Sequence, residues 1–487
     1  MKKVIKYIVA LLIMVSYTSC LDLDVEQDSK IDVSSMWKTD EDCKSAMYGM
    51  YGQMRVAFST NYAFWGDYRA GMFNSSLALG ADISYMCSNT ITSSNSGANW
   101  ASLYKLINMA NLVIKYTQDM PFSNETEKNW VLANAYYVRA FSYYYVARNW
   151  GDAPLLVDGF ESENGPNLYP VKTAVTEIYS QVEDDIKEAL LLMPATLPTG
   201  ASSQTTATVT AVNMLKVDYY MWMAKTQRMD TSIAYPAAQE GLDNIFADKN
   251  LTLLDTYSDI FEATKKKANT EAIFVIHFAK DEYEGGFAKN YLFTDGTVNA
   301  KDKDLIADGT IAIGTEGGIA QRVTFEANFE KLLYAVSSDQ RAQATYRVEK
   351  TTAKTYKWIN KYTGEWISNA RYYSSDIIVY RLADAVLFQA ELYGATGEPD
   401  KAIDELNKIA ERAYGIKNYY SYDTEDVDEI ILEERMKEFA AEGKLWWDFI
   451  RMGVVFERVP SLAGRENEKD VLLWPVHNDA KNKNPNL

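Results

Sequence analysis

Apolar side chains recur every three or four residues along most of this 487-residue chain, and this helical period constrains its fold more than any other feature. The stretch WASLYKLINMANLVIKYT gathers its apolar side chains on one helical face: Trp100, Leu103, Leu106, Ile107, Ala110 and Ile114. Near the C-terminus, YRLADAVLFQAELYGATGEPDKAIDELNKIAERA predicts a helix, a turn at Gly397 to Pro399 and a second helix. The pattern therefore predicts a chain built mainly from helical hairpins.

The pattern changes between the N-terminal and the C-terminal helices. The run EAIFVIHFA is apolar and β-branched, which predicts a strand, and residues 280–375 are rich in Gly, Asn, Thr and Asp, which favours loops. We predict a mostly α fold, a tetratricopeptide-like scaffold of helical hairpins with an inserted loop-rich lobe that contains short strands. The expected parts are a helical scaffold at 40–226, the lobe at 227–375, and a C-terminal helical segment with a tail at 376–487.

The chain starts with the features of a bacterial export signal. Three lysines precede a short apolar run, and the motif YTSC, which resembles a lipobox, places Cys20 at the cleavage point. We expect a signal peptide at 1–19, a lipid anchor on Cys20 and an acidic tether at 20–39. The alternative is an ordinary secreted protein whose cysteine is incidental. The other two cysteines are Cys43 and Cys87, and the sequence does not decide whether they pair.

Charge and composition exclude several functions. The formal net charge of −18 at pH 7 lacks the basic patch that binding to nucleic acid or to anionic lipid through charge requires. Because His277 and His477 are the only histidines, no His/Cys zinc pattern can be built, and the chain has no G-x-S-x-G motif. We expect no catalytic residue, metal or cofactor. The 34 tyrosines and 11 tryptophans favour a surface that binds a flat, hydroxyl-rich ligand.

The stretch EERMKEFAAEGKLWWDFIRMG concentrates charged and aromatic side chains in a predicted helix. Glu434, Glu438 and Glu442 lie four residues apart, so on a helix they share one face and repel each other by roughly 0.2–0.5 kcal/mol per pair. An enzyme could use two of them as acid and base, but neighbours on one helix point the same way and cannot flank a glycosidic bond. The favoured interpretation pairs these glutamates with cations from a neighbouring helix and ends the helix at Gly443.

Taken together, these motifs resemble the SusD/RagB nutrient-uptake lipoproteins of Bacteroidetes. The resemblance rests on the lipobox followed by LDLD, on MWKTDEDCKSAMYGMYGQM, NAYYVRAFSYYYVARNWGDAPL and RLADAVLFQAELY, and on the glutamate-rich stretch, where Leu445 replaces a common arginine. It implies a non-catalytic lipoprotein on the outer face of the outer membrane that delivers glycan to a SusC-like TonB-dependent transporter. It also implies that the glutamate-rich stretch is scaffold, with Arg435, Arg451 and Asp448 as the expected countercharges.

We expect the ligand to bind on loops where aromatic rings stand beside hydrogen-bonding groups, as a sugar site requires. The stretch AKDEYEGGFAKNYLFTDG supplies one such set: Tyr283, Phe287, Asn290 and Tyr291. The alternative for this stretch is a short helix that buries one aromatic face, which Gly285 and Gly286 disfavour. A second set, which could meet the first in the fold, comprises Trp65, Tyr68, Arg69 and Tyr85. Trp366, at a Thr-Gly turn, is a further candidate.

Two other functions fit the same sequence. The first is peptide capture by a member of the same family. The second is a secreted all-helical glycoside hydrolase, which needs an acid and a second carboxylate that face each other across a cleft at roughly 5–10 Å. Release of new reducing ends from a candidate glycan would distinguish the hydrolase from the binding protein.

Overall fold

The structure, a computed structural model, describes residues 36–487 with gaps at 79–80, 162–167, 308, 315–320 and 369. The predicted signal peptide, Cys20 and the predicted tether up to residue 35 lie outside the described residues. Thr39–Leu487 form one compact unit. No helix within the described ranges is both long and apolar enough to span a membrane.

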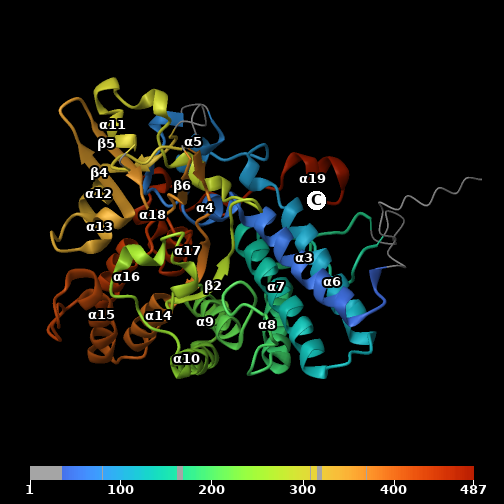
Figure 1. The fold of residues 1–487 in the computed structure, drawn as a ribbon. Helices are drawn as coiled ribbons and strands as arrows, with labels where there is room; N and C mark the ends of the chain where they lie inside the picture. The colour runs from blue at the N-terminus through green and yellow to red at the C-terminus, as the bar shows by residue number, and fades with distance from the viewer. Residues whose placement is uncertain (1–35, 79–80, 162–167, 308, 315–320, 369) are drawn as a thin grey trace, which may run out of the picture. The chain divides into compact units, whose positions relative to one another are not determined.

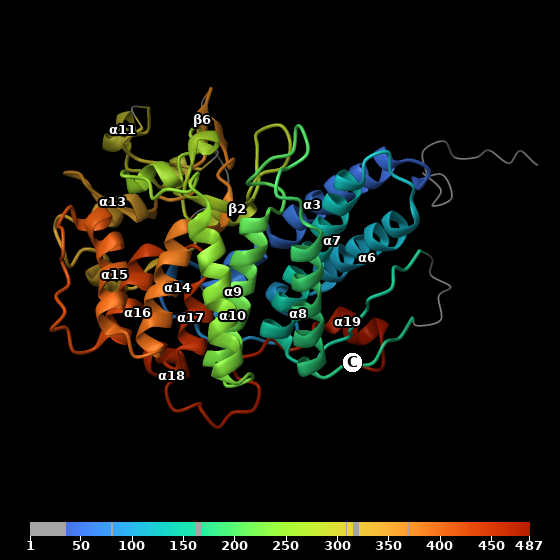
Figure 2. The same ribbon diagram turned by 90° about the horizontal axis from the view of Figure 1, so that it is seen from below.

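Helices make up most of the compact unit, which confirms the predicted mostly α fold. The long helices follow one another in a row in which each packs on the next, as Figures 1 and 2 show. In chain order they are α3 (Asp40–Phe58), α6 (Ala101–Asp119), α7 (Glu125–Trp150), α8 (Val175–Leu192), α9 (Val209–Lys225), α10 (Thr231–Ala247), α14 (Leu382–Ala395), α15 (Pro399–Tyr414) and α16 (Val427–Glu438).

Local signals in the sequence set the ends of these helices. At the start of α3, the Thr39 hydroxyl accepts from the backbone of Asp42, whose carboxylate accepts from the backbone of Thr39. Helix α7 ends at Gly151, which has φ +68°. Helix α15 begins at Pro399 and ends at Gly415 in the left-handed conformation, so the helix, turn and helix predicted for this part are confirmed.

Helix α10 lies in the stretch for which the sequence predicted loops and short strands. Pro236 and Gly241 disfavour a helix there, yet both lie inside it. The tertiary reason is close packing against α9, because a Cβ on Gly241 would lie 2.7 Å from the side chain of Val217. The contact between the two helices therefore outweighs the weak local propensity.

A two-stranded antiparallel ribbon joins the loop-rich lobe to the helices. Strand β2 (Ala272–Ile276) pairs with β8 (Ile377–Arg381), and every residue of both strands is buried. The strand predicted in EAIFVIHFA is thus confirmed. The chain enters the lobe after β2 and returns to the helices through β8, and the lobe lies at the upper left of Figure 1.

The lobe contains short helices and small ribbons. The helices are α11 (Asp304–Ala307), α12 (Ala327–Leu333) and α13 (Gln340–Thr345). The antiparallel pairs are β1 (Phe73–Asn74) with β3 (Thr324–Phe325), β4 (Tyr346–Lys350) with β5 (Thr355–Ile359), and β6 (Glu365–Ile367) with β7 (Ala370–Tyr372). Because β1 comes from the N-terminal part, this pair attaches the lobe to the N-terminal part as well.

The glutamate-rich stretch folds as two helices instead of one. Helix α16 ends at Glu438, and α17 begins at Leu445 and ends at Arg451. Between them Ala441 and Gly443 have positive φ angles. A side chain at Gly443 has no room, since a Cβ there would lie 2.3 Å from the ring of Tyr62 in α4 (Asn61–Gly66). This close approach of α4 to the turn is the physical reason for the break.

The two cysteines within the compact unit do not pair with each other. Cys43 is buried in α3, and Cys87 ends α5 (Asp82–Cys87). Burial raises the pKa of both thiols, to about 12 for Cys87, so neither is an activated nucleophile.

Candidate functional site

The predicted acid and base candidates, Glu434, Glu438 and Glu442, form a buried glutamate row. Their carboxylates bind cations from four separate parts of the chain: Arg341, Lys361, Arg381 and Arg412. Arg381 binds two of the three, with Nη1 2.5 Å from Glu438 Oε1 and Nη2 2.9 Å from Glu442 Oε1. The row is therefore part of the scaffold, as the favoured interpretation predicted.

The ionisation of the glutamate row does not suit acid–base catalysis. Burial alone raises the pKa of Glu438, but Arg412, Arg381 and Arg341 outweigh it and hold the pKa well below its ordinary value. The same balance of burial against arginine and lysine charges lowers the pKa of Glu434 and Glu442. All three carboxylates stay ionised at neutral pH, so none of them has the raised pKa of a general acid.

The prediction that Arg435, Arg451 and Asp448 are the countercharges of the glutamate row was wrong. Arg435 and Arg451 bind Asp448 instead, with Arg435 Nε 2.9 Å from Oδ2 and Arg451 Nη2 2.9 Å from Oδ1. Arg451 also binds Glu391 of α14. Both guanidinium groups lie over the ring of Phe388 in α14, that of Arg435 from α16 and that of Arg451 from α17.

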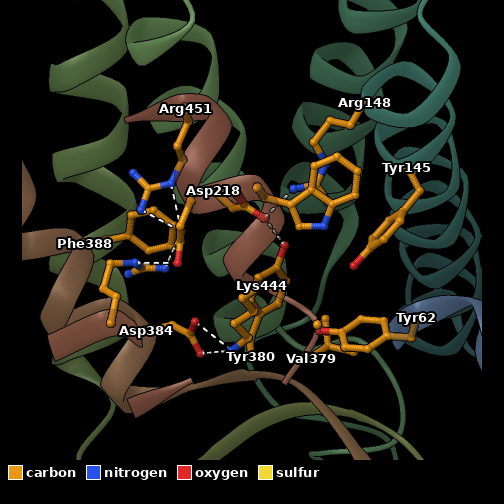
Figure 3. Close-up of a pocket in the computed structure, with 14 residues that line it drawn as sticks. Tyr62, Tyr145, Arg148, Asp218, Val379, Tyr380, Asp384, Phe388, Lys444 and Arg451 are labelled. Atoms are coloured by element: carbon orange, nitrogen blue, oxygen red, sulfur yellow. Dashed lines mark hydrogen bonds and ion pairs between the residues drawn. The ribbon is translucent and has the colours of Figure 1, made fainter. Parts of the chain in front are cut away.

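A small interior cavity of about 30 Å³ lies beside this network (Figure 3). It has room for one or two water molecules. Lys444 Nζ lies 2.6 Å from Asp384 Oδ2, and the Tyr380 hydroxyl donates to Asp218 at 2.8 Å. These charged groups already bind one another, and the cavity is too small for a sugar.

Three of the predicted ligand contacts, Trp65, Tyr68 and Arg69, lie in the core. Trp65 donates its indole N–H to a backbone carbonyl at 2.8 Å, and the guanidinium of Arg69 packs 4.3 Å from the ring of Trp446. A ligand at the surface does not reach them, so their assignment to the binding site does not fit the structure. Trp65 lies in α4, which packs on α17, and Tyr68 and Arg69 follow directly after this helix. Tyr85, on α5, is exposed.

The segment after β2 also buries most of its predicted contacts. Phe287 and Asn290 lie in a short 3₁₀ helix, and both are buried, as is Tyr291 beyond its end. The rings of Phe287 and Tyr291 pack against Tyr362 with centroid separations of 4.8 and 6.4 Å. The alternative interpretation, a short helix that buries an aromatic face, describes this segment. Tyr283 is 37% exposed.

The two aromatic stretches meet in the fold, but they meet inside the protein. The ring of Phe73 packs against Tyr68 at 5.0 Å and against Tyr291 at 6.1 Å, measured between centroids. Burial raises the pKa of Tyr291, in keeping with its place in the core. This contact therefore attaches the lobe to the N-terminal part and does not form a surface for a ligand.

Three larger cavities, of about 650, 560 and 350 Å³, have volumes typical of small-ligand sites. In the first, between α6 and α19 (Asn478–Lys483), Trp100 is nearly buried and the Tyr104 hydroxyl donates to a backbone carbonyl. In the second, beside α12, Phe329 and Phe449 are nearly buried. The third, in the lobe, includes the half-buried ring of Trp366. We take the third, the Trp366 cleft, as the candidate site.

Two hairpins of the lobe build the Trp366 cleft. Arg347 of β4 pairs with Trp358 of β5, and Trp366 of β6 pairs with Arg371 of β7. Cross-strand partners project from the same face of a ribbon, so each hairpin presents one tryptophan and one arginine to the cleft. The other lining residues are Ile306, Gly309, Thr310, Ile311, Ala312, Ile313, Asn360 and Thr363.

Arg371 sets the orientation of Trp366. Its guanidinium lies 5.0 Å from the centre of the indole ring, while Nε donates to Ile313 O at 2.9 Å and Nη1 to Thr363 O at 3.0 Å. A planar guanidinium held in this way keeps the ring as a flat platform. Gly364, with φ +60°, makes the hairpin possible, since a Cβ there would lie 2.1 Å from a backbone oxygen.

The polar groups around this platform include several hydrogen-bond donors. Trp358 donates its indole N–H to Asn360 Oδ1 at 2.9 Å, so the amide nitrogen of Asn360 can donate to a ligand. The side chain of Arg347 is 41% exposed and adds a guanidinium. Burial lowers the pKa of Arg371 to about 10 against the effect of Tyr373, so it is charged at neutral pH. A flat ring beside donors suits a pyranose, whose apolar face stacks and whose hydroxyls accept.

Of the predicted ligand contacts, Trp366 alone lines this cleft, and the sequence analysis missed Arg347, Trp358 and Arg371. Alternating runs on either side of the polar turn at 351–354 could have indicated the first hairpin, and Gly364 could have indicated the second. The approach of the two hairpins to each other is tertiary, and no local pattern encodes it.

The comparisons with known proteins cover nearly the whole chain. A family model described as "SusD family" matches residues 218–487, and one described as "Starch-binding associating with outer membrane" matches residues 23–215. SusD-like protein P38 of Formosa agariphila is 25% identical to this chain, over 98% of it and 97% of that relative.

Solved structures show the same fold. NanU of B. fragilis superposes with a TM-score of 0.81 at 27% identity and covers 94% of this chain and 98% of its own. Surface glycan-binding protein A from Bacteroides fluxus has a TM-score of 0.73 and covers 91% of this chain and 97% of its own. Its identity of 17% shows a likeness of fold alone.

Proposed function

The chain belongs to the SusD family, and on this premise we propose that it is a non-catalytic, surface-exposed lipoprotein that binds glycan in the Trp366 cleft. The choice of site rests on two pairs of cross-strand partners, Arg347 with Trp358 and Trp366 with Arg371, around a cavity of about 350 Å³. The lobe between β2 and β8 then holds the site, and the helices before and after it are the scaffold that carries it.

The experiment is a binding screen of the purified protein against oligosaccharides and peptides, followed by calorimetry on the best ligand. Trp366→Ala removes the stacking platform, so we expect at least a tenfold loss of glycan affinity, which corresponds to about 1.4 kcal/mol. Tyr85→Ala is the matched control, because it removes an exposed aromatic ring that does not line the cleft. Equal affinities of the two variants would place the site elsewhere, and selective binding of peptides would favour the peptide-capturing alternative.

We also infer that the protein does not cleave its ligand. The charged carboxylates of the glutamate row are buried and bound to cations, and the described lining of the Trp366 cleft contains no Asp or Glu. Incubation with the bound glycan should therefore release no new reducing ends. Clear turnover would contradict this inference and support the hydrolase alternative.

Two further parts of the proposal concern the cell surface. We infer that Cys20 carries the lipid anchor and that a SusC-like TonB-dependent transporter in the outer membrane receives the glycan. The family description that matches residues 23–215, association with the outer membrane, supports this. Cys20→Ala should leave the fold intact and release the protein from membranes, and its retention after washing contradicts the anchor. If the wild type co-purifies with no outer-membrane protein in mild detergent, the proposed transporter partner is contradicted.

A further inference from the structure

The interior cavity of about 30 Å³ has charged walls, and in Figure 3 Arg148, Lys444 and Arg451 face it from different sides. Its lining comes from β8, from α4, α7, α9, α14, α16 and α17, and from the turn before α17, and none of these elements contains a gap in the description. Seven of the lining side chains are charged: Arg148, Asp218, Asp384, Arg435, Lys444, Asp448 and Arg451. The groups around this space are therefore known.

Three buried N–H groups of this lining have no hydrogen-bond partner among the described residues. They are Nε of Arg148, Nη1 of Arg435 and the indole Nε1 of Trp447, and each of these residues is at most 5% exposed. All three groups can only donate. An unpaired donor away from water is unfavourable, so three of them around one cavity indicate an acceptor from outside the protein.

The ion pairs around the cavity do not balance. Its lining contains more cations than carboxylates, namely Arg148, Arg435, Lys444 and Arg451 against Asp218, Asp384 and Asp448. Behind the lining, Arg451 binds Glu391, which lies 3.7 Å from Lys225, so this pair adds one charge of each sign. Asp67 binds the backbone of the turn at Gly443 and belongs to none of these ion pairs. The formal charge of the ion pairs is therefore +1, and an excess charge in the interior is unfavourable without a counterion.

Arg148 is the cation of this set that lacks a hydrogen-bonded carboxylate. Its Nη1 lies 3.8 Å from Asp218 Oδ2, which is too long for a hydrogen bond. Asp218 accepts instead from the hydroxyls of Tyr144 and Tyr380, at 3.0 and 2.8 Å. The guanidinium lies 4.5 Å from the ring centre of Trp447, so two of the three unpaired donors belong to side chains in contact. An acceptor in the cavity can bind Arg148 without displacing a partner.

A halide ion satisfies these groups better than a water molecule does. The volume of about 30 Å³ exceeds the roughly 10–15 Å³ that one water requires, so an ion slightly larger than water fits. A water oxygen accepts two hydrogen bonds and brings two donors of its own, which add to the excess of donors. A halide brings no donor, can accept from all three N–H groups and cancels the excess positive charge.

We propose that the interior cavity binds a small monovalent anion of the size of chloride, held by Arg148, Arg435 and Trp447. The anion connects α7 with α16 and α17, so it stabilises the contact between the N-terminal and the C-terminal helices. This inference does not rest on the proposed function, because the cavity shares no lining residue with the Trp366 cleft.

The direct experiment uses bromide, which replaces chloride and is located by its anomalous scattering. Crystals of the purified protein soaked in sodium bromide should show an anomalous peak inside the cavity, within hydrogen-bond distance of Trp447 Nε1. Bromide peaks at the surface alone, or water in the cavity without an anomalous signal, would overturn the proposal.

Thermal melts test the same site in solution, with sodium chloride replacing sodium gluconate at constant ionic strength. We expect Tm to rise by about 1–2 °C for each tenfold increase in chloride above its dissociation constant. Trp447→Phe keeps an aromatic ring but removes one donor. Trp446→Phe is the matched control, because Trp446 is also buried with an unpaired indole N–H but does not line the cavity.

The two variants should differ in their response to chloride. The concentration at which Tm begins to rise should be about tenfold higher in Trp447→Phe and unchanged in Trp446→Phe, since one hydrogen bond to the anion is lost. A general effect of salt acts on both variants alike, so equal responses would overturn the anion site, as would a wild-type Tm that does not depend on chloride. If Trp447→Phe does not fold, the bromide experiment on the wild type decides.

Discussion

Arg381 in the helical scaffold and Arg371 in the lobe differ in the groups that hold them. Arg381, fully buried at the start of α14, binds the carboxylates of three glutamates. Arg371, on β7, is held by two backbone carbonyls and by the ring of Trp366. At Arg381, charge meets opposite charge and the result is structural. At Arg371, backbone carbonyls and a ring hold the guanidinium beside the Trp366 cleft.

The scaffold pairs are also spread widely along the chain. Glu271 precedes β2, Arg381 ends β8, and Arg412 lies in α15, yet the three side chains meet at Glu438 or at one another. Such a buried network contributes little net free energy, because desolvation of each ion opposes the attraction between them. Its role is to specify which elements lie together, and this holds only while every member is present.

The largest expected effect is therefore the removal of Arg381. Arg381→Met keeps an apolar stem but leaves three buried carboxylates without their shared cation. Loss of one partner from a buried pair costs about 3–5 kcal/mol, so we expect the free energy of unfolding to fall by that amount, or the variant not to fold. Urea denaturation followed by circular dichroism measures it. Arg347→Met, at an exposed pair, should cost less than about 1 kcal/mol. Similar losses in both variants would remove the distinction between the two regions.

The next effect is the contrast between two tyrosines in the segment after β2. Tyr291 is 1% exposed and packs on Phe73 and Tyr362, whereas Tyr283 is 37% exposed. Tyr291→Ala should therefore lower the free energy of unfolding by about 3 kcal/mol, and Tyr283→Ala by less than about 1 kcal/mol. Thermal melts of the two variants make the comparison. A stable Tyr291→Ala protein with impaired glycan binding would return this segment to the candidate site.

The third effect is a pH dependence that belongs to the scaffold. Asp67 accepts from the backbone of Gly443 at 2.6 Å and of Lys444 at 3.2 Å, and burial raises its pKa to about 7, with Lys361 opposing and Glu442 reinforcing the shift. Because the folded pKa lies above the unfolded value of 3.8, the proton is bound more tightly in the folded state. Stability from this group is fully present below about pH 4 and is lost as the pH rises through 7.

Asp67→Asn removes that titration. The free energy of unfolding of the variant, taken relative to that of the wild type, should therefore rise between pH 5 and pH 8 by on the order of 2 kcal/mol. The slopes of stability against pH are compared, and not the absolute stabilities. Asparagine has one side-chain oxygen instead of two, so the variant loses one of the two backbone hydrogen bonds at every pH. Urea midpoints of both proteins across this range provide the measurement. Parallel pH profiles would show that Asp67 is already ionised in the folded protein at pH 5.

The sequence predicted the scaffold better than the site, and particular residues show why. Helical spacing and local caps such as Thr39, Pro399 and Gly415 are short-range signals, so the helices they bound could be read directly. The partners of Glu438 lie 26 and 57 residues away, and they could not be read from its own helix. Similarly, the aromatic residues near Trp65 and Tyr291 have the composition of a sugar site, and only the packing around Phe73 shows that they are core.

The smallest expected effect on stability is that of Trp366→Ala. It gives the sharpest comparison of the lobe with the scaffold, because the same substitution can be made at Trp65. Trp65 is fully buried in the scaffold, and Trp65→Ala should cost about 3–5 kcal/mol. Trp366 is half-buried on a short hairpin, where it packs on the cross-strand Arg371, and such a pair contributes roughly 0.2–1 kcal/mol. Trp366→Ala should therefore unfold within about 1 kcal/mol of the wild type although it loses glycan affinity. If it is instead as unstable as Trp65→Ala, then Trp366 is a core residue of the lobe, and its loss of binding would report unfolding and not a missing platform.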